Sequence, residues 1–148
     1  MISNKLLYAH SLERFLVAQE NCYEEVLEQL KDGLKLTHWI WFIFPQLRGL
    51  GQTEYSQYFG LISGQEAKEY WHHPVLGPRY RECLQLLLAS GLTAESVLGK
   101  LDAKKLHSSL TLFEYAVPDD PLITSALSHL FDGTRDSATH YLIVKPIT

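Results

Sequence analysis

The sequence is poor in cysteine and has no long hydrophobic run. Its two cysteines, Cys22 and Cys83, lie far apart in segments with helical patterns, so we expect buried free thiols rather than a disulfide. The longest near-continuous apolar runs, Trp39 to Phe44 and Leu84 to Ala89, are far too short to cross a bilayer. The first seven residues also lack the apolar core of a secretory signal. These absences predict a cytoplasmic protein.

No stretch of the chain is strongly basic, and the formal net charge is −4. This balance argues against broad binding of nucleic acid or of anionic membranes. No linker or low-complexity run divides the 148 residues, which suffice to bury one core without disulfides or metal. We therefore expect one domain over residues 1–148, with neither nucleic acid nor membrane as a partner.

Several familiar site motifs are missing as well. There is no Cys-x-x-Cys or His-x-x-x-His pair, and the histidines fit no ligand spacing, so we predict no metal site. The glycines after Pro45 match neither a phosphate-binding P-loop nor a dinucleotide fingerprint, and we predict no cofactor. Nucleophilic serine chemistry is disfavoured because no Gly-x-Ser-x-Gly elbow is present.

What the sequence does contain is a dense aromatic segment within Thr37 to Gly51. Every position from Trp39 to Phe44 is apolar, so we expect this segment to be buried on all sides, with the other elements wrapped around it. Its aromatic and β-branched content favours a strand, whereas its length and the lack of hairpin signals permit a helix. We predict a helix over residues 34–44 that ends at Pro45.

Apolar spacing and capping residues predict the other elements. One helix is expected from Ser11 to Lys31, closed by a left-handed Gly33. Ser63 opens a Ser-x-x-Glu capping box, and Asp102 is expected to cap the helix that follows it. The further helical segments are expected over residues 53–59, 64–71, 78–89, 93–98, 103–115 and 121–131. The predicted fold class is mainly α, a single compact multi-helix domain with a buried Trp-rich central segment; the type of the segment Tyr141 to Val144 stays open.

The first candidate for chemistry is His38, at the start of the aromatic segment. A histidine beside a buried run is often structural, bonded through both ring nitrogens, but an imidazole also exchanges protons near neutral pH and can serve as a general acid or base. Trp39 and Trp41 can stack on a flat ligand, although large aromatics are more often core. Gln46 lies in the glycine-bearing loop that follows, which is either a functional loop or an ordinary connector.

A second candidate lies around His73 and Arg79. If Pro78 is the first residue of a helix, Arg79 and the free N–H groups of the first turn form an anion site. The alternative is an exposed arginine beside turn histidines.

The third candidate is the predicted helix after Asp102. It carries Lys105, Ser108, Ser109 and Thr111 between apolar residues, and buried hydroxyls need partners. They either bond the backbone one turn back or line a polar pocket.

Several of these residues also carry a family resemblance, which extends from Leu12 to Leu142. The matching segments are Leu12–Phe15, Ala18–Gln19, His38–Gln46, Gly49–Gly51, Glu66–Ala67, Tyr70, His73–Gly77, Arg79, Leu98–Gly99, Asp102, Lys105–Leu106, Ser108–Ser109, Thr111–Phe113, Gly133 and Asp136. Through them, and above all through the block His-Trp-x-Trp-x-x-Phe-Pro-Gln, the chain resembles the bacterial DUF1810 family.

The resemblance implies a mainly α-helical single-domain protein and brings no proven catalytic residue. The calpastatin-like label given to some members has no support here, because no protease-inhibitor repeat is present. The polar positions of the family motif fall on His38, Gln46, His73, Arg79, Asp102, Lys105, Ser108, Ser109 and Thr111.

The leading hypothesis is a polar pocket between the Trp-rich segment and the helices at Pro78 and Ala103, which binds a small anionic, nucleotide-like ligand and acts on it. His38 is the predicted catalytic residue. The predicted ligand-binding residues are Trp39, Trp41, Gln46, His73, Arg79, Lys105, Ser108 and Ser109. The alternative is a non-catalytic protein-interaction module in which these polar residues are structural.

Overall fold

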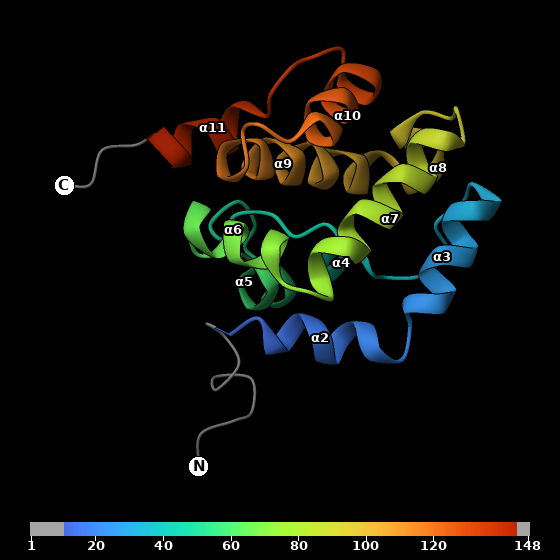
Figure 1. The fold of residues 1–148 in the computed structure, drawn as a ribbon, viewed down its shortest axis with the longest axis horizontal. Helices are drawn as coiled ribbons and strands as arrows, with labels where there is room; N and C mark the ends of the chain where they lie inside the picture. Colours follow the sequence, from blue (N-terminus) through green and yellow to red (C-terminus); the bar gives the residue numbers. More distant parts are fainter. Residues whose placement is uncertain (1–10, 145–148) are drawn as a thin grey trace.

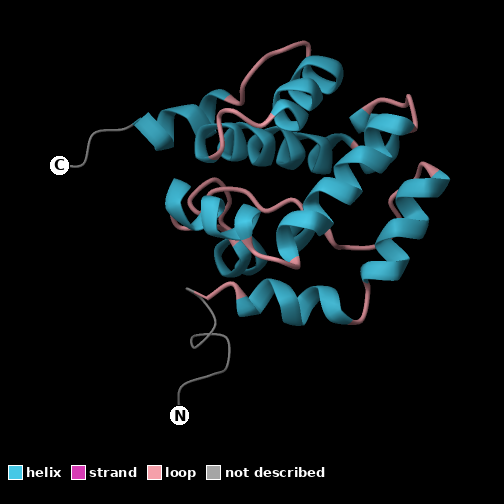
Figure 2. Ribbon diagram, in the orientation of Figure 1, coloured by secondary structure: helices cyan, strands magenta, loops and turns pink. Residues whose placement is uncertain are grey.

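The computed structural model describes residues 11–144, and every regular element in that range is a helix (Figures 1 and 2). The elements are α2 (Glu13–Glu20), α3 (Tyr23–Asp32), α4 (Ile40–Ile43), α5 (Glu54–Phe59), α6 (Gly64–His72), α7 (Leu76–Ala89), α8 (Ala94–Leu98), α9 (Lys100–Ala116), α10 (Pro121–Phe131) and α11 (Ser137–Val144). The predicted all-α class is confirmed. The expectation about the first seven residues lies outside the described range.

The long helix α9 runs through the middle of the molecule (Figure 1). It packs against α10 and α11 on one side and against α6 and α4 on the other, and α8 packs against it as well. α7 connects these layers, because it contacts α3, α4, α6 and α10. α2 lies beyond α4 at the far edge of the molecule. In the described part of the chain, no helix has the length and apolar character needed to span a membrane.

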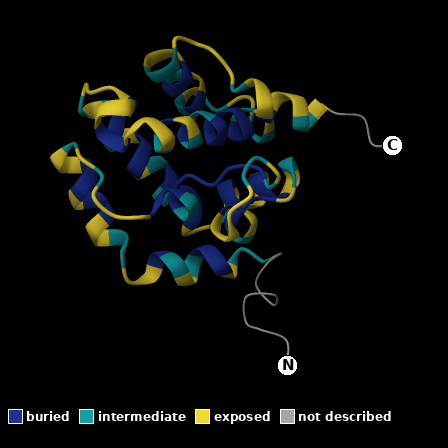
Figure 3. Cartoon of the chain, turned by 180° about the vertical axis from the view of Figure 1, so that it is seen from behind, coloured by how far each residue is buried: buried dark blue, intermediate teal, exposed yellow. Residues whose placement is uncertain are grey.

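The aromatic segment lies in the core, as predicted, but it is not enclosed on all sides. Trp39, Ile40, Ile43 and Phe44 are buried, whereas Trp41 and the residue after it are only half-buried. Figure 3 shows the buried residues facing inward between the helices and the exposed ones on the outer faces. The half-buried Trp41 is therefore the tryptophan of this segment that reaches the surface.

The predicted helix over residues 34–44 forms only at Ile40–Ile43. Before it residues 34–39 are not helical, and several of their N–H groups bond to acceptors elsewhere in the fold. Lys35 N–H donates to the carbonyl of Val97 (2.8 Å), and Leu36 N–H donates to the side chain of Gln29 (2.8 Å). The N–H of Thr37, the first one that a helix beginning at residue 34 would bond to its own carbonyls, also donates to the Gln29 side chain (3.3 Å).

The single helix predicted from Ser11 to Lys31 is in fact two helices. α2 ends at Glu20 and α3 begins at Tyr23, with Asn21 and Cys22 between them in non-helical conformations. The break lets each half bury its apolar side against a different neighbour, since α2 packs on α4 and α3 packs on α7. The predicted end is confirmed, because Gly33 has a φ of 76° and its N–H closes α3.

Several predicted helix starts are confirmed in detail. The hydroxyls of Thr53, Ser63 and Thr93 each accept from a backbone N–H three residues later. Only half of the predicted capping box forms at Ser63, because the carboxylate of Glu66 accepts from Ile62 N–H and pairs with Arg14 instead.

Two predicted starts are wrong by two or three residues. α7 begins at Leu76 rather than Pro78, because Nδ1 of His73 accepts from the N–H groups of Val75 and Leu76 (3.1 and 3.2 Å) and caps the helix earlier. Pro78 is tolerated there because the first-turn N–H groups have no intrahelical acceptor. α9 begins at Lys100 rather than Ala103, with Gly99 at the cap in a positive-φ conformation.

Candidate ligand-binding site

The irregular segment before α4 and the start of α9 border a hollow of about 510 Å³. We call it the lysine hollow. It is lined by Lys35, Leu36, Thr37, His38, Ile40, Trp41, Leu98, Gly99, Lys100, Leu101, Asp102 and Lys105. The hollow therefore gathers residues from two segments that are about sixty residues apart in sequence.

One glutamine of α3 holds the first wall of the hollow in place. The side-chain oxygen of Gln29 accepts from Leu36 N–H (2.8 Å) and from Nε1 of Trp39 (2.9 Å), and its amide donates to the hydroxyl of Thr37 (2.9 Å). Trp39 is thereby fixed in the core with 2% of its surface exposed, while its neighbour His38 is exposed at the mouth of the hollow.

A single carboxylate organises the lysines. Oδ2 of Asp102 lies 2.7 Å from Nζ of Lys35, and Oδ1 lies 3.1 Å from Nζ of Lys105. The Lys35 side chain is 7% exposed, so its ammonium group approaches the carboxylate from within the protein. Lys100 adds a third positive charge to the lining, so three lysines face one aspartate and the formal charge of the hollow is +2 with His38 neutral.

Trp41 lies beside this cluster. Nζ of Lys105 is 4.5 Å from the centroid of the Trp41 ring, within the range of a cation–π contact. Tyr55 packs nearby, with its ring centroid 6.5 Å from that of Trp41. Lys105 therefore contacts both Asp102 and Trp41, and a change at any one of the three alters the other two.

The start of α9 also faces the hollow. No side chain in the described residues caps this helix; the cap is Gly99, whose φ of 87° is one that other residues rarely adopt. The first turn of a helix carries partial positive charge, which adds to that of the lysines. Asp102, predicted as the cap of this helix, lies in its first turn and uses its carboxylate for the two lysines.

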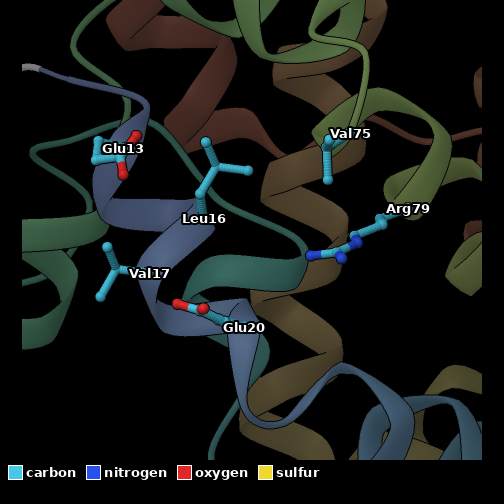
Figure 4. Close-up of a pocket in the computed structure, with 6 residues that line it drawn as sticks. All are labelled: Glu13, Leu16, Val17, Glu20, Val75 and Arg79. Carbon is cyan, nitrogen blue, oxygen red and sulfur yellow. The ribbon is translucent and has the colours of Figure 1, made fainter.

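Arg79 does not line this hollow. It borders a smaller hollow of about 250 Å³, together with Glu13, Glu20 and apolar residues of α2 (Figure 4). Its guanidinium donates to the side-chain oxygen of Gln19 (3.2 Å) and lies 4.5 Å from the centroid of the Tyr23 ring. His73 is also occupied, because its Nδ1 caps α7. The structure therefore separates Arg79 from His38 and fills the predicted anion site at the start of α7 with a histidine ring.

The remaining predicted ligand residues bond within the fold. The hydroxyl of Ser108 donates to the carbonyl of Lys104 (3.1 Å), one turn back, and that of Ser109 bonds to the hydroxyl of Tyr80 (2.8 Å) in the core. Gln46 is buried, and its backbone carbonyl accepts from Leu61 N–H (2.9 Å) in an isolated bridge between two loops. None of the three lines the lysine hollow.

Burial favours the neutral forms of two thiols and of a core tyrosine. Burial raises the pKa of the Cys83 thiol to about 12, and burial likewise raises the pKa of Tyr80 and of Cys22. Both cysteines are free thiols. Within residues 11–144 no three His, Cys, Asp or Glu side chains are grouped so as to hold a metal ion.

Comparison with known proteins gives a family and a solved relative. Residues 9–143 match the family model described as "Protein of unknown function (DUF1810)". The chain belongs to the DUF1810 family. It is 38% identical to the conserved hypothetical protein Rv1873 from Mycobacterium tuberculosis, whose crystal structure superposes with a TM-score of 0.89 over 93% of this chain and 99% of that one. No curated protein matches the chain.

The polar residues that carry the sequence resemblance fall in several places in this structure. His38, Asp102 and Lys105 line the lysine hollow, together with Trp41. His73, Ser108 and Ser109 make the internal hydrogen bonds described above. Reasoning from the sequence missed Lys35, Lys100 and Gln29. Lys35 is only three residues before His38 and could have been considered on that ground, whereas nothing in the sequence connects Gln29 to the hollow.

Proposed function

We propose that the lysine hollow binds a small anionic, nucleotide-like ligand. The observation that supports this most directly is the excess of positive charge: three lysines and the start of α9 face a single carboxylate. Lysine ammonium groups and helix N-termini are both suited to phosphate and carboxylate groups. The hollow also lies within the usual size range of small-molecule sites.

In this proposal each residue has a separate task. Lys35 and Lys105 bind the anion, and Asp102 keeps their two ammonium groups side by side while the hollow is empty. Trp41 is the stacking residue, since Trp39 is buried. Because Lys105 lies over the Trp41 ring, an anion that draws Lys105 away uncovers that ring for the flat part of the ligand.

His38 is the residue we propose as general acid or base on the bound ligand. It is exposed at the mouth of the hollow, next to a segment fixed by Gln29. An imidazole in that place can reach a ligand and donate a proton to it or accept one from it.

Binding is tested by a thermal-shift screen against nucleotides, ADP-ribose derivatives and phosphorylated metabolites. We expect at least one of them to raise the Tm, because a ligand that binds only the folded state stabilises it. The rise should be lost in Lys105→Gln and retained in Lys104→Gln, a neighbour on the same helix that does not line the hollow. Failure of every compound to raise the Tm would exclude this function.

The role of His38 needs a separate measurement. A ligand found in the screen is incubated with the wild type and with His38→Ala, and the products are analysed by mass spectrometry. The proposal expects conversion by the wild type only, with binding retained in the variant. If the wild type converts none of the ligands that bind, the hollow is a binding site without a catalytic histidine.

A further inference from the structure

Among residues 11–144, the two most exposed large apolar side chains both border the lysine hollow. Leu36 is 71% exposed and Leu101 is 72% exposed, and both line the hollow. They come from its two opposite walls, the segment before α4 and the first turn of α9. Single exposed leucines are common on protein surfaces, but here two of them flank one charged concavity.

These leucines have no evident use for a small phosphorylated ligand held by Lys35 and Lys105. A partner that covers an exposed apolar side chain at the edge of a site stabilises the complex by about 25 cal/mol for each Å² of apolar area removed from water. The partner must therefore offer apolar side chains at the rim and negative charge at the centre.

We propose that the lysine hollow and its two leucines form a docking surface for an acidic, leucine-containing polypeptide segment. An aspartate, glutamate or phosphoserine of that segment enters the hollow toward Lys35 and Lys105, and flanking apolar side chains pack on Leu36 and Leu101. This inference rests on the proposed function, because it uses the same anion-binding lysines. It adds that the anionic group belongs to a polypeptide.

The shape of the site favours a polypeptide over an anionic bilayer. The surface is concave, and the Lys35 side chain is 7% exposed, so an anionic group that belongs to a larger partner needs an arm to reach it. Side chains of a bound segment provide such arms, whereas headgroups in a flat bilayer do not. The net charge of −4 also opposes approach to an anionic membrane.

The test uses arrayed short peptides in which one aspartate, glutamate or phosphoserine stands between leucines. Matched peptides replace the acid by glutamine or the leucines by serine. The fluorescently labelled full-length protein is applied as wild type, as the double variant Leu36→Ser/Leu101→Ser, as Lys105→Gln, and as Leu92→Ser. Leu92 is an exposed leucine outside the hollow and serves as the matched control. Circular dichroism melting confirms that each variant is folded.

We expect binding only to peptides with both the acid and the leucines. The double leucine variant should bind them about tenfold more weakly, the effect of losing burial of one or two apolar side chains, and Leu92→Ser should bind like the wild type. Equal binding by the double variant, equal binding of the glutamine peptides, or no binding of any peptide would overturn the docking proposal. So would leucine-dependent binding to phosphatidylserine vesicles, or a leucine-dependent increase in sedimentation mass with concentration, which would assign the face to lipid or to a second copy.

The same variants separate this proposal from the proposed function. If nucleotides or phosphorylated metabolites still raise the Tm of the double leucine variant and no peptide binds, the anion site stands and the docking inference fails. If Lys105→Gln changes neither small-anion nor peptide binding, both fail.

Discussion

Two charged clusters in this molecule each join segments that are distant in sequence, but they differ in how their groups are satisfied. In the first, Arg14 of α2 pairs with Glu66 of α6 at 3.2 Å, with Arg14 only 1% exposed. The guanidinium also donates to the carbonyls of Tyr58 (2.8 Å) and Gly60 (3.0 Å), and Glu66 also accepts from Ile62 N–H (2.9 Å). Within this pair one positive charge meets one negative charge, and other guanidinium donors bond to backbone carbonyls. Arg48 lies nearby: burial lowers its pKa, the charge of Arg14 lowers it further, and the charge of Glu66 opposes this.

The second cluster is the lysine hollow, where the charges do not balance. Asp102 takes one bond from Lys35 and one from Lys105, each of which has three N–H donors, and Lys100 adds a further charge. The cluster is open to solvent at His38 and Trp41 instead of being enclosed. The difference suggests a way to separate structural from ligand-binding polar groups: the first kind is buried with its hydrogen bonds made within the fold, the second carries excess charge and faces a hollow.

The largest effect on stability should come from breaking the buried pair. Glu66→Ala leaves the Arg14 charge uncompensated inside the protein and should lower the free energy of unfolding by about 3–5 kcal/mol. Urea unfolding followed by circular dichroism measures this. The matched change in the other cluster, Asp102→Ala, should cost less, about 1–2 kcal/mol, because the side chains of Asp102 and Lys105 are 18% and 23% exposed, although that of Lys35 is only 7% exposed. Similar losses in both variants would contradict the comparison.

Asp102→Asn tests the excess positive charge of the lysine hollow through its anion affinity rather than through stability. The substitution removes the one negative charge of the hollow but keeps an oxygen that can accept from the lysines. Anion affinity should rise by about fivefold, the effect of removing roughly 1 kcal/mol of repulsion. Isothermal titration with a ligand identified by thermal shift provides the measurement, and the increase should shrink as salt is added. Weaker binding would mean that Asp102 contacts the ligand itself.

His73, which bonds within the fold, and His38, which is exposed at the hollow, allow the same comparison with smaller expected changes in stability. His73→Ala removes the acceptor for two N–H groups at the start of α7 and should lower the free energy of unfolding by about 1 kcal/mol, whereas Asn at this position should restore most of it. His38→Ala should change stability by less than about 0.5 kcal/mol, because His38 is exposed. Thermal or urea unfolding of the three variants tests this; a larger loss from His38→Ala would make that residue structural.

The last effect concerns the buried thiol of Cys83 and is confined to alkaline pH. Its pKa is raised from 9.0 to about 12 by burial, so between these values the folded protein keeps a proton that the unfolded chain releases. The free energy of unfolding should therefore fall as the pH rises from 9 toward 12, and the fall should be smaller in Cys83→Ala.

Alkylation followed by mass spectrometry should modify the half-buried Cys22 first. Prior modification of Cys83 in the folded protein would contradict its burial.

The sequence was sufficient to predict the all-α class, most helix positions and the caps at Thr53, Ser63 and Thr93. These features depend on local patterns of apolar and capping residues. The errors arose where a distant side chain changed the local outcome. Gln29 accepts from Thr37 N–H, which a helix over 34–44 would need for its own hydrogen bonds, and Glu66 pairs with Arg14 instead of completing its capping box.

For the site, the sequence identified His38, Trp41 and Lys105, which the structure brings to one hollow. It also grouped Arg79 with them, which the structure places in a different hollow beside Gln19 and Tyr23. Spacing along the chain cannot show which faces of α7 and α9 meet the segment before α4. Those faces are set by the packing of the helices, such as that of α3 on α7 and of α8 on α9.

The most direct test of the lysine hollow as the anion site is a two-dimensional NMR titration of the ¹⁵N-labelled protein with inorganic pyrophosphate. The account predicts amide shifts concentrated at Lys35 to Trp41 and at Gly99 to Lys105, with little change around Arg79. Shifts centred on Arg79 and α2, or no saturable shifts anywhere, would contradict it.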